Sequence, residues 1–240
     1  MISALKRGFA ARQFNPGFWG IFLNPFYLAR RGLRREMEKA SPSLTGSLLD
    51  VGCGTQPYRN LFRVHSYIGL ELDTLVSRKR AVADAYYDGT TFPFAEGRFD
   101  SVLCNQVLEH VFTPDAFLNE IYRVLKPGGK VLLTVPFIWD EHEQPFDYAR
   151  YSSFGLRALL ERNGFRVISQ KKILADASVL FQLLNAYLFK VTDSHSIFIK
   201  LATRIMLFAP ISALGWVASV LLPTNEDMFL DQLVIAERPL

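Results

Sequence analysis

The stretch LLDVGCGTQPYRNLF, from Leu48 to Phe62, constrains the fold more than any other part of the chain. A run of apolar residues leads to the acid Asp50, and Gly52 and Gly54 follow directly. Glycines at the end of a buried strand allow a ligand to lie against the main chain, and a helix beginning there presents free N–H groups. We therefore expect this loop to end a strand, to open a helix and to bind a small ligand.

The residues around the loop distinguish between two kinds of ligand. A dinucleotide site has the pattern G-x-G-x-x-G, with a pyrophosphate over the helix N-terminus. Here Pro57 stands at the third glycine position, and Asp50 precedes the loop. A carboxylate suits a cationic ligand, such as an amino group, better than a pyrophosphate. The pattern therefore disfavours a nicotinamide oxidoreductase.

A second acid, Glu71, closes the next predicted strand, and Asp73 follows it closely. An acid at the tip of this strand commonly accepts hydrogen bonds from both ribose hydroxyls, because a carboxylate has two oxygens. The alternative is that both are ordinary loop acids. Given the glycine loop upstream, we interpret Glu71 as a ribose ligand, with Asp73 as a substitute.

The rest of the central chain alternates short apolar runs with helical patterns, which is typical of a parallel α/β sheet. Apolar spacing predicts helices over 113–126, with Thr113 as N-cap, and over 152–165, capped by Ser152 or Ser153. The expected strands are 47–52, 67–72, 99–105, 130–137, 166–172 and 231–239, with a weaker one within 80–86.

Composition supports one such domain in a reducing compartment. The chain has 240 residues, and half of them are apolar, which excludes a disordered protein. Its two cysteines, Cys53 and Cys104, make neither a disulfide framework nor a metal cluster, which favours the cytoplasm.

The N-terminal region, residues 1–44, is basic and aromatic, and we interpret it as a helical extension. It either covers the domain with solvated arginines or forms a surface for anionic lipid or an anionic substrate. No nucleic-acid-binding motif accompanies the charges, so we expect no nucleic-acid partner. The apolar residues are interrupted by prolines, which argues against a secretory signal. The basic residues are Lys6, Arg7, Arg12, Arg30, Arg31, Arg34 and Arg35.

A second unusual segment, about residues 177–223, is strongly apolar, and 205–225 contains no charged residue. By length it is a borderline transmembrane candidate. Pro210 weakens that reading, and so does the strand over 231–239, which must rejoin the same sheet. We expect a helical insert that packs on the domain, forms a homodimer face or lies in the plane of a membrane surface.

Four segments, in order and with matching gaps, resemble the class I S-adenosylmethionine-dependent methyltransferases of the small-molecule, type 11-like group. They read LLDVGCGT, YIGLELD, DGTTFPFAEGRFDSVLCNQVLEHV and NEIYRVLKPGGKVLLTVP, and the resemblance spans about residues 45–170. It implies a Rossmann-like α/β fold: a seven-stranded sheet with an antiparallel last strand and helices on both faces. It also implies S-adenosyl-L-methionine as cofactor.

Carried over residue by residue, the resemblance places Asp50, Gly52 and Gly54 around the methionine moiety of the donor. It makes Glu71 the ribose acid. This sequence departs from many relatives at Gln56-Pro57, where they have a further glycine, and at Glu71, where aspartate is commoner. The turn is therefore expected to have a different shape, whereas the longer acid is chemically equivalent.

The resemblance also supplies the far end of the donor site. Asp88 matches the acid that reads the adenine amino group, with Gly89 beside it. Asn105 and Gln106, at the end of the strand over 99–105, match positions that line the donor near its sulfonium.

Candidate catalytic residues follow the strand over 130–137, in FIWDEHEQPFDYARYS. Methyl transfer needs mainly alignment, and a base helps only a hydroxyl or a protonated amine. His142 is the leading candidate base because imidazole titrates near neutrality, and the alternative is an exposed loop histidine. His110 is family-typical and receives no catalytic role. His65 and His195 are scattered, and no grouping has metal-ligand spacing, so no metal is expected. Candidate acceptor ligands are Asp140, Glu141, Asp147, Tyr148 and Arg150.

The sequence therefore predicts an S-adenosylmethionine-dependent methyltransferase domain over 45–240 that modifies a small-molecule or lipid-linked acceptor, with oxygen favoured. The alternative is a catalytically inactive donor-binding protein at a membrane surface or in a complex. We expect a cytoplasmic protein, with attachment to the inner membrane face as a further expectation.

Overall fold

The computed structural model describes residues 14, 16–80, 82–192, 194 and 196–240. The predictions on Lys6, Arg7, Arg12 and His195 lie outside these residues. The chain forms two compact units. We call Glu36–Phe137, Glu141–Lys171 and Asp231–Leu240 the sheet unit, and residues up to Arg35 with Ile138–Asp140 and Lys172–Leu230 the helical unit.

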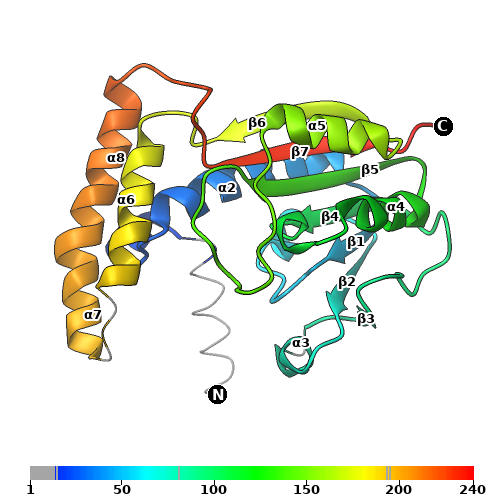
Figure 1. The fold of residues 1–240 in the computed structure, drawn as a ribbon, viewed down its shortest axis with the longest axis horizontal. Helices are drawn as coiled ribbons and strands as arrows, with labels where there is room; N and C mark the ends of the chain where they lie inside the picture. Colours follow the sequence, from blue (N-terminus) through cyan, green and yellow to red (C-terminus); the bar gives the residue numbers. More distant parts are fainter. Residues whose placement is uncertain (1–13, 15, 81, 193, 195) are drawn as a thin grey trace. The chain divides into compact units, whose positions relative to one another are not determined.

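The sheet unit is built on seven strands in the order β3-β2-β1-β4-β5-β7-β6 (Figure 1). The pairs formed by neighbours from β3 to β5 are parallel, and β7 runs antiparallel to β5. This confirms the predicted Rossmann-like sheet with a reversed last strand. The strands are β1 (Ser47–Val51), β2 (Ser66–Leu72), β3 (Ala85–Tyr87), β4 (Phe99–Asn105), β5 (Leu125–Pro136), β6 (Arg166–Ile173) and β7 (Asp231–Glu237).

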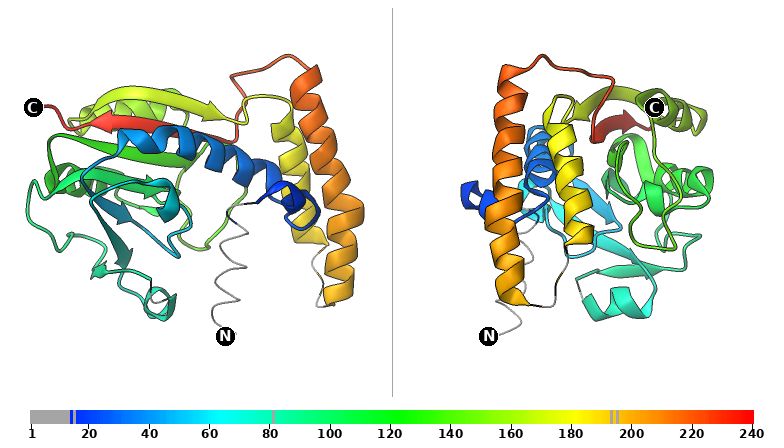
Figure 2. Two further views of the ribbon diagram at one scale, coloured as in Figure 1. Left: turned by 180° about the vertical axis from the view of Figure 1, so that it is seen from behind. Right: turned by 60° about the vertical axis from the view of Figure 1, so that its left-hand side comes forward.

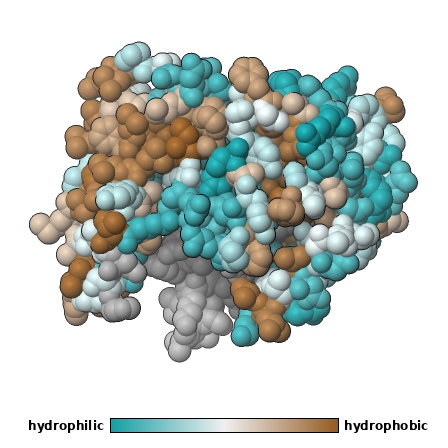
Figure 3. All heavy atoms as spheres, in the orientation of Figure 1, coloured by the Kyte–Doolittle hydropathy of each residue, from teal (hydrophilic) through white to brown (hydrophobic). Residues whose placement is uncertain are grey.

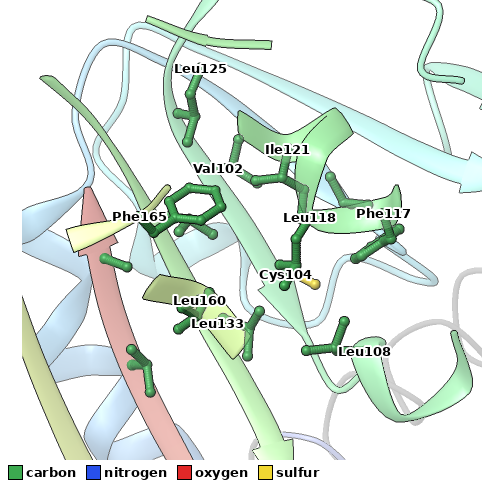
Figure 4. Packing of buried hydrophobic residues seen from close by; sticks show 14 of the residues in the cluster. Val102, Cys104, Leu108, Phe117, Leu118, Ile121, Leu125, Leu133, Leu160 and Phe165 are labelled. Carbon is green, nitrogen blue, oxygen red and sulfur yellow. The ribbon is translucent and has the colours of Figure 1, made fainter. Parts of the chain in front are cut away.

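The central strands are mostly apolar because both of their faces are covered. In β1, Leu48, Leu49 and Val51 are all fully buried. Helices α4 (Pro114–Val124) and α5 (Ser153–Arg162) contribute apolar stripes to this core, and Figure 4 shows Leu118, Ile121 and Leu160 against the strands. Helix α3 (Leu75–Arg80) is short, and η2 (Ser41–Ser43) and η4 (Leu108–His110) are single 3-10 turns.

The caps of α4 and α5 differ. Ser152 is the N-cap of α5, and its Oγ accepts a hydrogen bond of 3.1 Å from Gly155 N, as one of the two predicted caps. Thr113 occupies the N-cap position of α4, but its side chain makes no capping bond there. Pro114 needs none at the first helical position, because it has no N–H group.

One local prediction is wrong: no α-helix follows the glycine loop. The described chain between Gly54 and β2 contains only the 3-10 turn η3 (Arg59–Leu61). The left-handed backbone at Gln56 interrupts helical geometry directly after the loop. The described link from the loop to Ser66 therefore forms only short turns.

The helical unit contains the predicted apolar insert, which is helical in the described residues. Helix α6 (Ser178–Val191) lies beside α8 (Ala209–Leu221), and both views of Figure 2 show them side by side. Helix α7 (Ile197–Thr203) and a π-helical turn, η5 (Arg204–Phe208), lead into α8. The unit also includes η1 (Phe18–Phe22), and α2 (Tyr27–Ala40) is shared between the two units.

Buried polar side chains fix the packing of this helical pair. Asn185 Nδ2 on α6 donates 2.9 Å to Ser212 Oγ on α8, and both residues are fully buried. Gln182, also fully buried, accepts from Ala29 N at 3.1 Å and donates to Pro25 O at 3.2 Å. Such fully desolvated hydrogen bonds are costly to break, so they specify one arrangement of the helices.

Candidate functional site

The carboxyl ends of β1, β2 and β4 meet at one edge of the sheet. Val51, the last residue of β1, pairs with Leu70 on one side and with Cys104 on the other. The chain proceeds from β1 to β2 and β3 in one direction, and β4 lies on the opposite side of β1. Ligands of open α/β sheets bind at such a switch point, outside the ends of the strands.

The glycine loop at this edge leaves the main chain uncovered at one position. Gly52 (φ +68°) and Gly54 (φ +49°) both have left-handed backbones that side chains rarely adopt. A Cβ on Gly52 would lie 2.4 Å from Val107 Cγ2, whereas a Cβ on Gly54 would meet nothing within 4 Å. A side chain at position 52 would therefore collide with Val107, whereas the main chain at Gly54 borders open space that a ligand can fill.

The structure shows how the chain accommodates Gln56 where many relatives have a further glycine. Gln56 adopts φ +52°, the conformation that a further glycine would take most easily. Its Nε2 donates to Val82 O at 2.9 Å, and its N donates to Cys53 O at 2.8 Å. These bonds hold the turn before Pro57.

The two acids of the far strands flank the loop. Glu71, at the end of β2, accepts from Gly54 N at 2.7 Å through Oε2. Asp88 follows β3, and its Oδ1 accepts from Thr90 N, Thr90 Oγ1 and Thr91 N. These hydrogen bonds lower the pKa of Asp88 to about 2. The side chain of Asp88 is exposed, so its carboxylate is accessible to a ligand.

Asp50 is almost completely buried, with 4% exposure, and Tyr67 Oη donates to its Oδ2 at 2.5 Å. Burial raises the pKa of Asp50 to about 7, although the hydrogen bond from Tyr67 opposes the shift. The contact shown is therefore with a phenol, and a role toward the amino group of a ligand stays a prediction.

The end of β4 carries the other predicted donor residues. Asn105 Oδ1 accepts from Thr134 Oγ1 at 2.8 Å. Gln106 has a left-handed backbone (φ +55°), and its N donates to Thr134 O at 3.0 Å. Its side chain also bonds Asp231, whose pKa burial raises to about 7.

These observations fit a nucleoside with a cationic amino acid chain. The edge offers uncovered main chain at Gly54, a carboxylate at Glu71 and a second, exposed carboxylate at Asp88. S-adenosyl-L-methionine is a molecule of this kind, and these residues would hold its methionine, ribose and adenine parts in that order.

A second cluster follows β4 and continues in the loop after β5. Glu109 is fully buried, and burial raises its pKa to about 8. Nδ1 of His110 lies 2.8 Å from Phe146 O, and the His110 ring meets His142 edge to face at 4.8 Å. Burial lowers the pKa of His110. The structure thus joins His142, the predicted base, to a histidine that had no predicted role.

Asp147 and Arg150 organise this loop as a pair. Arg150 Nη1 and Nη2 donate to the two carboxylate oxygens of Asp147 at 2.6 and 2.7 Å, a bidentate arrangement that lowers the pKa of Asp147 well below its usual range. Asp147 Oδ2 also accepts from His142 N at 2.9 Å and lies 3.3 Å from His142 Nδ1. Asp147 therefore orients the His142 ring.

The other predicted acceptor ligands lie outside the cluster of His142, Asp147 and Arg150 contacts. The Tyr148 ring packs edge to face on Phe112, and both side chains are exposed. Glu141 accepts a long hydrogen bond from Gln144. Asp140 belongs to the helical unit, where it forms an ion pair of 2.7 Å with Lys190.

Sequence reasoning missed Tyr67, Glu109 and Asp231. Tyr67 and Asp50 lie on neighbouring strands, so their contact depends on strand register. Asp231 begins β7 opposite Pro136, the last residue of β5, which brings it to the edge where the parallel strands end. An acid at the start of a predicted antiparallel strand was the available signal for Asp231.

Comparison with known proteins agrees with this geometry. Residues 49–133 match the family described as Methyltransferase domain. Malonyl-[acyl-carrier protein] O-methyltransferase of Erwinia pyrifoliae is 32% identical over 45% of this chain and 44% of its own length. Demethylmenaquinone methyltransferase of Symbiobacterium thermophilum is 33% identical over 45% of this chain and 46% of its own. The chain thus spans less than half the length of these curated relatives.

Solved structures share the fold over most of the chain. The [4+2]-cyclase SpnF has a TM-score of 0.58 at 20% identity, covering 88% of this chain and 82% of its own. A SAM-dependent methyltransferase from Archaeoglobus fulgidus has a TM-score of 0.55 at 15% identity, covering 92% of this chain and 100% of its own.

The strand order, the glycine loop and the acids at the switch point define a Rossmann-like, nucleoside-binding protein. Within that class, residues 49–133 belong to the methyltransferase domain family. This match agrees with the resemblance to the class I S-adenosylmethionine-dependent methyltransferases, whose cofactor is S-adenosyl-L-methionine.

Proposed function

We propose that the protein transfers the methyl group of S-adenosyl-L-methionine to an oxygen of a small-molecule or lipid-linked acceptor. The observation that carries this proposal is the uncovered main chain at Gly54, whose N–H group bonds Glu71 at the switch point of the sheet. The relatives named above support a small acceptor. One is named as an O-methyltransferase, and the other is named for demethylmenaquinone.

The residues of this edge act mainly by alignment. The cofactor supplies a methyl group that is already activated on a sulfonium, so the protein must hold donor and acceptor in line and exclude water. Glu71 and Asp88 position the nucleoside from β2 and β3, and Asn105 positions it from β4. The acceptor is then held on the side of the second cluster, in the loop after β5.

An oxygen acceptor must lose a proton during transfer, because a neutral hydroxyl is a weak nucleophile. We assign this deprotonation to the cluster of His110 and His142. Its support is the edge-to-face contact of the two imidazoles and the orientation of His142 by Asp147.

A turnover assay tests the proposed activity. Host extract is incubated with the protein and isotopically labelled methyl donor, and the products are analysed by mass. We expect one class of molecules to gain the label with wild-type protein. Glu71→Ala should weaken donor binding by about 10- to 100-fold, because a lost charge-assisted hydrogen bond costs about 1.5–3 kcal/mol.

The same experiment distinguishes the proposed methyltransferase from the alternative, an inactive donor-binding protein. SpnF shows that this fold also occurs in a protein named for cyclisation, so the fold alone does not fix the reaction. Tight donor binding with no label transferred to any host molecule would favour the alternative. Absence of donor binding would contradict both.

We extend the proposal to location: the protein is cytoplasmic and attaches to the inner face of a membrane through its helical unit. Its support is Ile197–Leu221, a helical stretch of 25 residues with mean hydropathy 1.7, long and apolar enough to cross a membrane by length and composition. Only 17% of its most apolar window is buried, and apolar residues gather over α6 and α8 in Figure 3.

Attachment to the surface suits this unit better than a crossing. The partner helix α6 has 14 residues, which reach about 21 Å and cannot cross a hydrocarbon core of about 30 Å. The chain after α8 also returns to β7 in the sheet. The unit carries Arg31, Lys200 and Arg204, which favour an anionic surface.

Flotation with vesicles tests this attachment. Phe198 and Val220, which are 81% and 70% exposed, are both replaced by Gln in one variant. We expect wild-type protein to float with phosphatidylglycerol-containing vesicles and the double variant to float at least about tenfold less, since each buried apolar side chain contributes about 1.5–3 kcal/mol.

The matched control replaces Phe154 and Ile168, exposed apolar residues of the sheet unit, by Gln. This variant should float like wild type. Equal flotation of all three proteins would contradict membrane attachment. A double variant that changes only from dimer to monomer in sedimentation would instead assign the apolar face to a second copy of the chain.

A further inference from the structure

Two adjacent side chains and a third from a distant loop converge beside the predicted acceptor loop. Glu109 and His110 follow β4, and His142 comes from the loop after β5. One ligand atom from each lies within 4.8 Å of the others. The sequence showed no metal-ligand spacing because these residues come from separate elements, and the structure brings them together.

Glu109 is the strongest sign that this cluster has an occupant. Its side chain is fully buried, and among the described residues neither carboxylate oxygen has a hydrogen-bond partner. A buried carboxylate without a partner is costly and rare in folded proteins. Oε1 of Glu109 lies 3.9 Å from His110 Nε2, so the carboxylate faces the imidazole.

Both histidines are oriented as metal ligands usually are. The Phe146 carbonyl can only accept, so Nδ1 of His110 carries the proton and Nε2 keeps its lone pair toward Glu109. The Asp147 carboxylate lies 3.3 Å from His142 Nδ1, which makes Nε2 the ligating nitrogen of that ring. Ligating histidines almost always donate their second ring nitrogen to a carbonyl or a carboxylate in this manner.

The surrounding charges are compatible with a cation. Arg150 Nη2 lies 3.5 Å from His142 Nδ1, but both of its donating nitrogens bond Asp147. That pair is neutral as a whole, so it does not repel a cation, and Glu109 would add a negative charge on losing its proton when a cation binds. The buried Asp231 adds an electrostatic interaction with Glu109.

We propose that Glu109, His110 and His142 bind one divalent cation of the zinc class, with the remaining coordination position open to water or to an acceptor hydroxyl. Two imidazoles and one carboxylate form a ligand set that suits Zn²⁺ and other first-row cations. Such a cation would lower the pKa of a bound hydroxyl toward neutrality, and the proton would pass to solvent water because both imidazoles would be held as ligands. This would account for the deprotonation assigned to the cluster above. In this form the proposal rests on the proposed function, but cation binding itself does not.

Metal binding to the full chain tests the site. Chelator-stripped wild-type protein is dialysed against Zn²⁺, its bound zinc is counted, and the visible absorption of Co²⁺-loaded protein is recorded. We expect one tightly bound ion and Co²⁺ bands of a nitrogen- and oxygen-ligated site. His142→Ala, in a partly exposed loop, should weaken binding at least about 100-fold and remove the bands.

Two further variants keep the result interpretable. Asp147→Asn should weaken binding about 10- to 100-fold, as losses of outer-shell partners do. His65→Ala removes an exposed histidine elsewhere in the sheet unit and should bind like wild type. Equal zinc content and affinity in wild type and His142→Ala, or no bound ion in wild type, would overturn the site. Methyl transfer without metal would leave the proposed function and the cation site standing, and it would overturn only the role of the cation in deprotonation.

Discussion

Gly54→Ala is expected to weaken S-adenosyl-L-methionine binding at least about tenfold while the sheet unit stays folded. The added methyl group meets no protein atom within 4 Å, so it occupies the space that a ligand against the main chain requires. A left-handed alanine costs about 1–2 kcal/mol, which a domain of this size tolerates. Calorimetric titration with the donor measures the first effect, and thermal unfolding measures the second.

Gly97→Ala is the matched control for this substitution. Gly97 is also left-handed (φ +63°), and a Cβ there would also meet nothing within 4 Å. It precedes β4, so it lies at the opposite edge of the sheet from Gly54. We expect the same loss of stability in both variants and unchanged donor binding in Gly97→Ala. Donor binding as strong in Gly54→Ala as in wild type would contradict the assignment of the donor edge.

The strands could be predicted because their signals are local or are carried by contiguous motifs. The apolar runs 47–52 and 99–105 are buried on both faces as β1 and β4, which is the pattern of a parallel sheet. The antiparallel β7 came only from the family resemblance. The helix after Gly54 was predicted from the glycine loop and is wrong, because the left-handed backbone at Gln56 interrupts helical geometry there.

The site was harder to predict because its parts meet only in the folded chain. Glu71 could be named from its position at a strand end, and Asp88 only from the family resemblance. The contact of Tyr67 with Asp50 needs the strand register, and the grouping of Glu109 with His142 needs the path of a loop. The grouping of residues up to Arg35 with the insert likewise depends on tertiary contacts.

Asp50→Asn is expected to stabilise the donor-free protein above pH 7 and to have little effect near pH 4. Burial raises the pKa of Asp50 from 3.8 to about 7, so between these values the folded chain holds a proton that the unfolded chain has lost. The free energy of unfolding therefore falls as the pH rises through this window. A shift of about three pH units corresponds to about 4 kcal/mol, which is the upper bound of the stabilisation.

Asparagine keeps the accepting oxygen for Tyr67, so the substitution removes the charge and preserves the hydrogen bond. Denaturant unfolding at pH 4.5 and pH 8 measures the difference between variant and wild type, in which the contributions of other buried acids largely cancel. Tyr67→Phe provides the opposite case. It leaves the buried charge without its donor and should destabilise the protein at pH 8 by about 1–3 kcal/mol.

The same variant separates the structural role of Asp50 from its role in binding. If the carboxylate attracts the amino group of the donor, Asp50→Asn binds S-adenosyl-L-methionine more weakly at pH 8 despite its greater stability. Stability and affinity then change in opposite directions, a result that general damage to the fold does not produce. An unfolding free energy that differs from wild type by the same amount at both pH values would contradict the buried, pH-dependent charge. Unchanged affinity would assign Asp50 to Tyr67 alone.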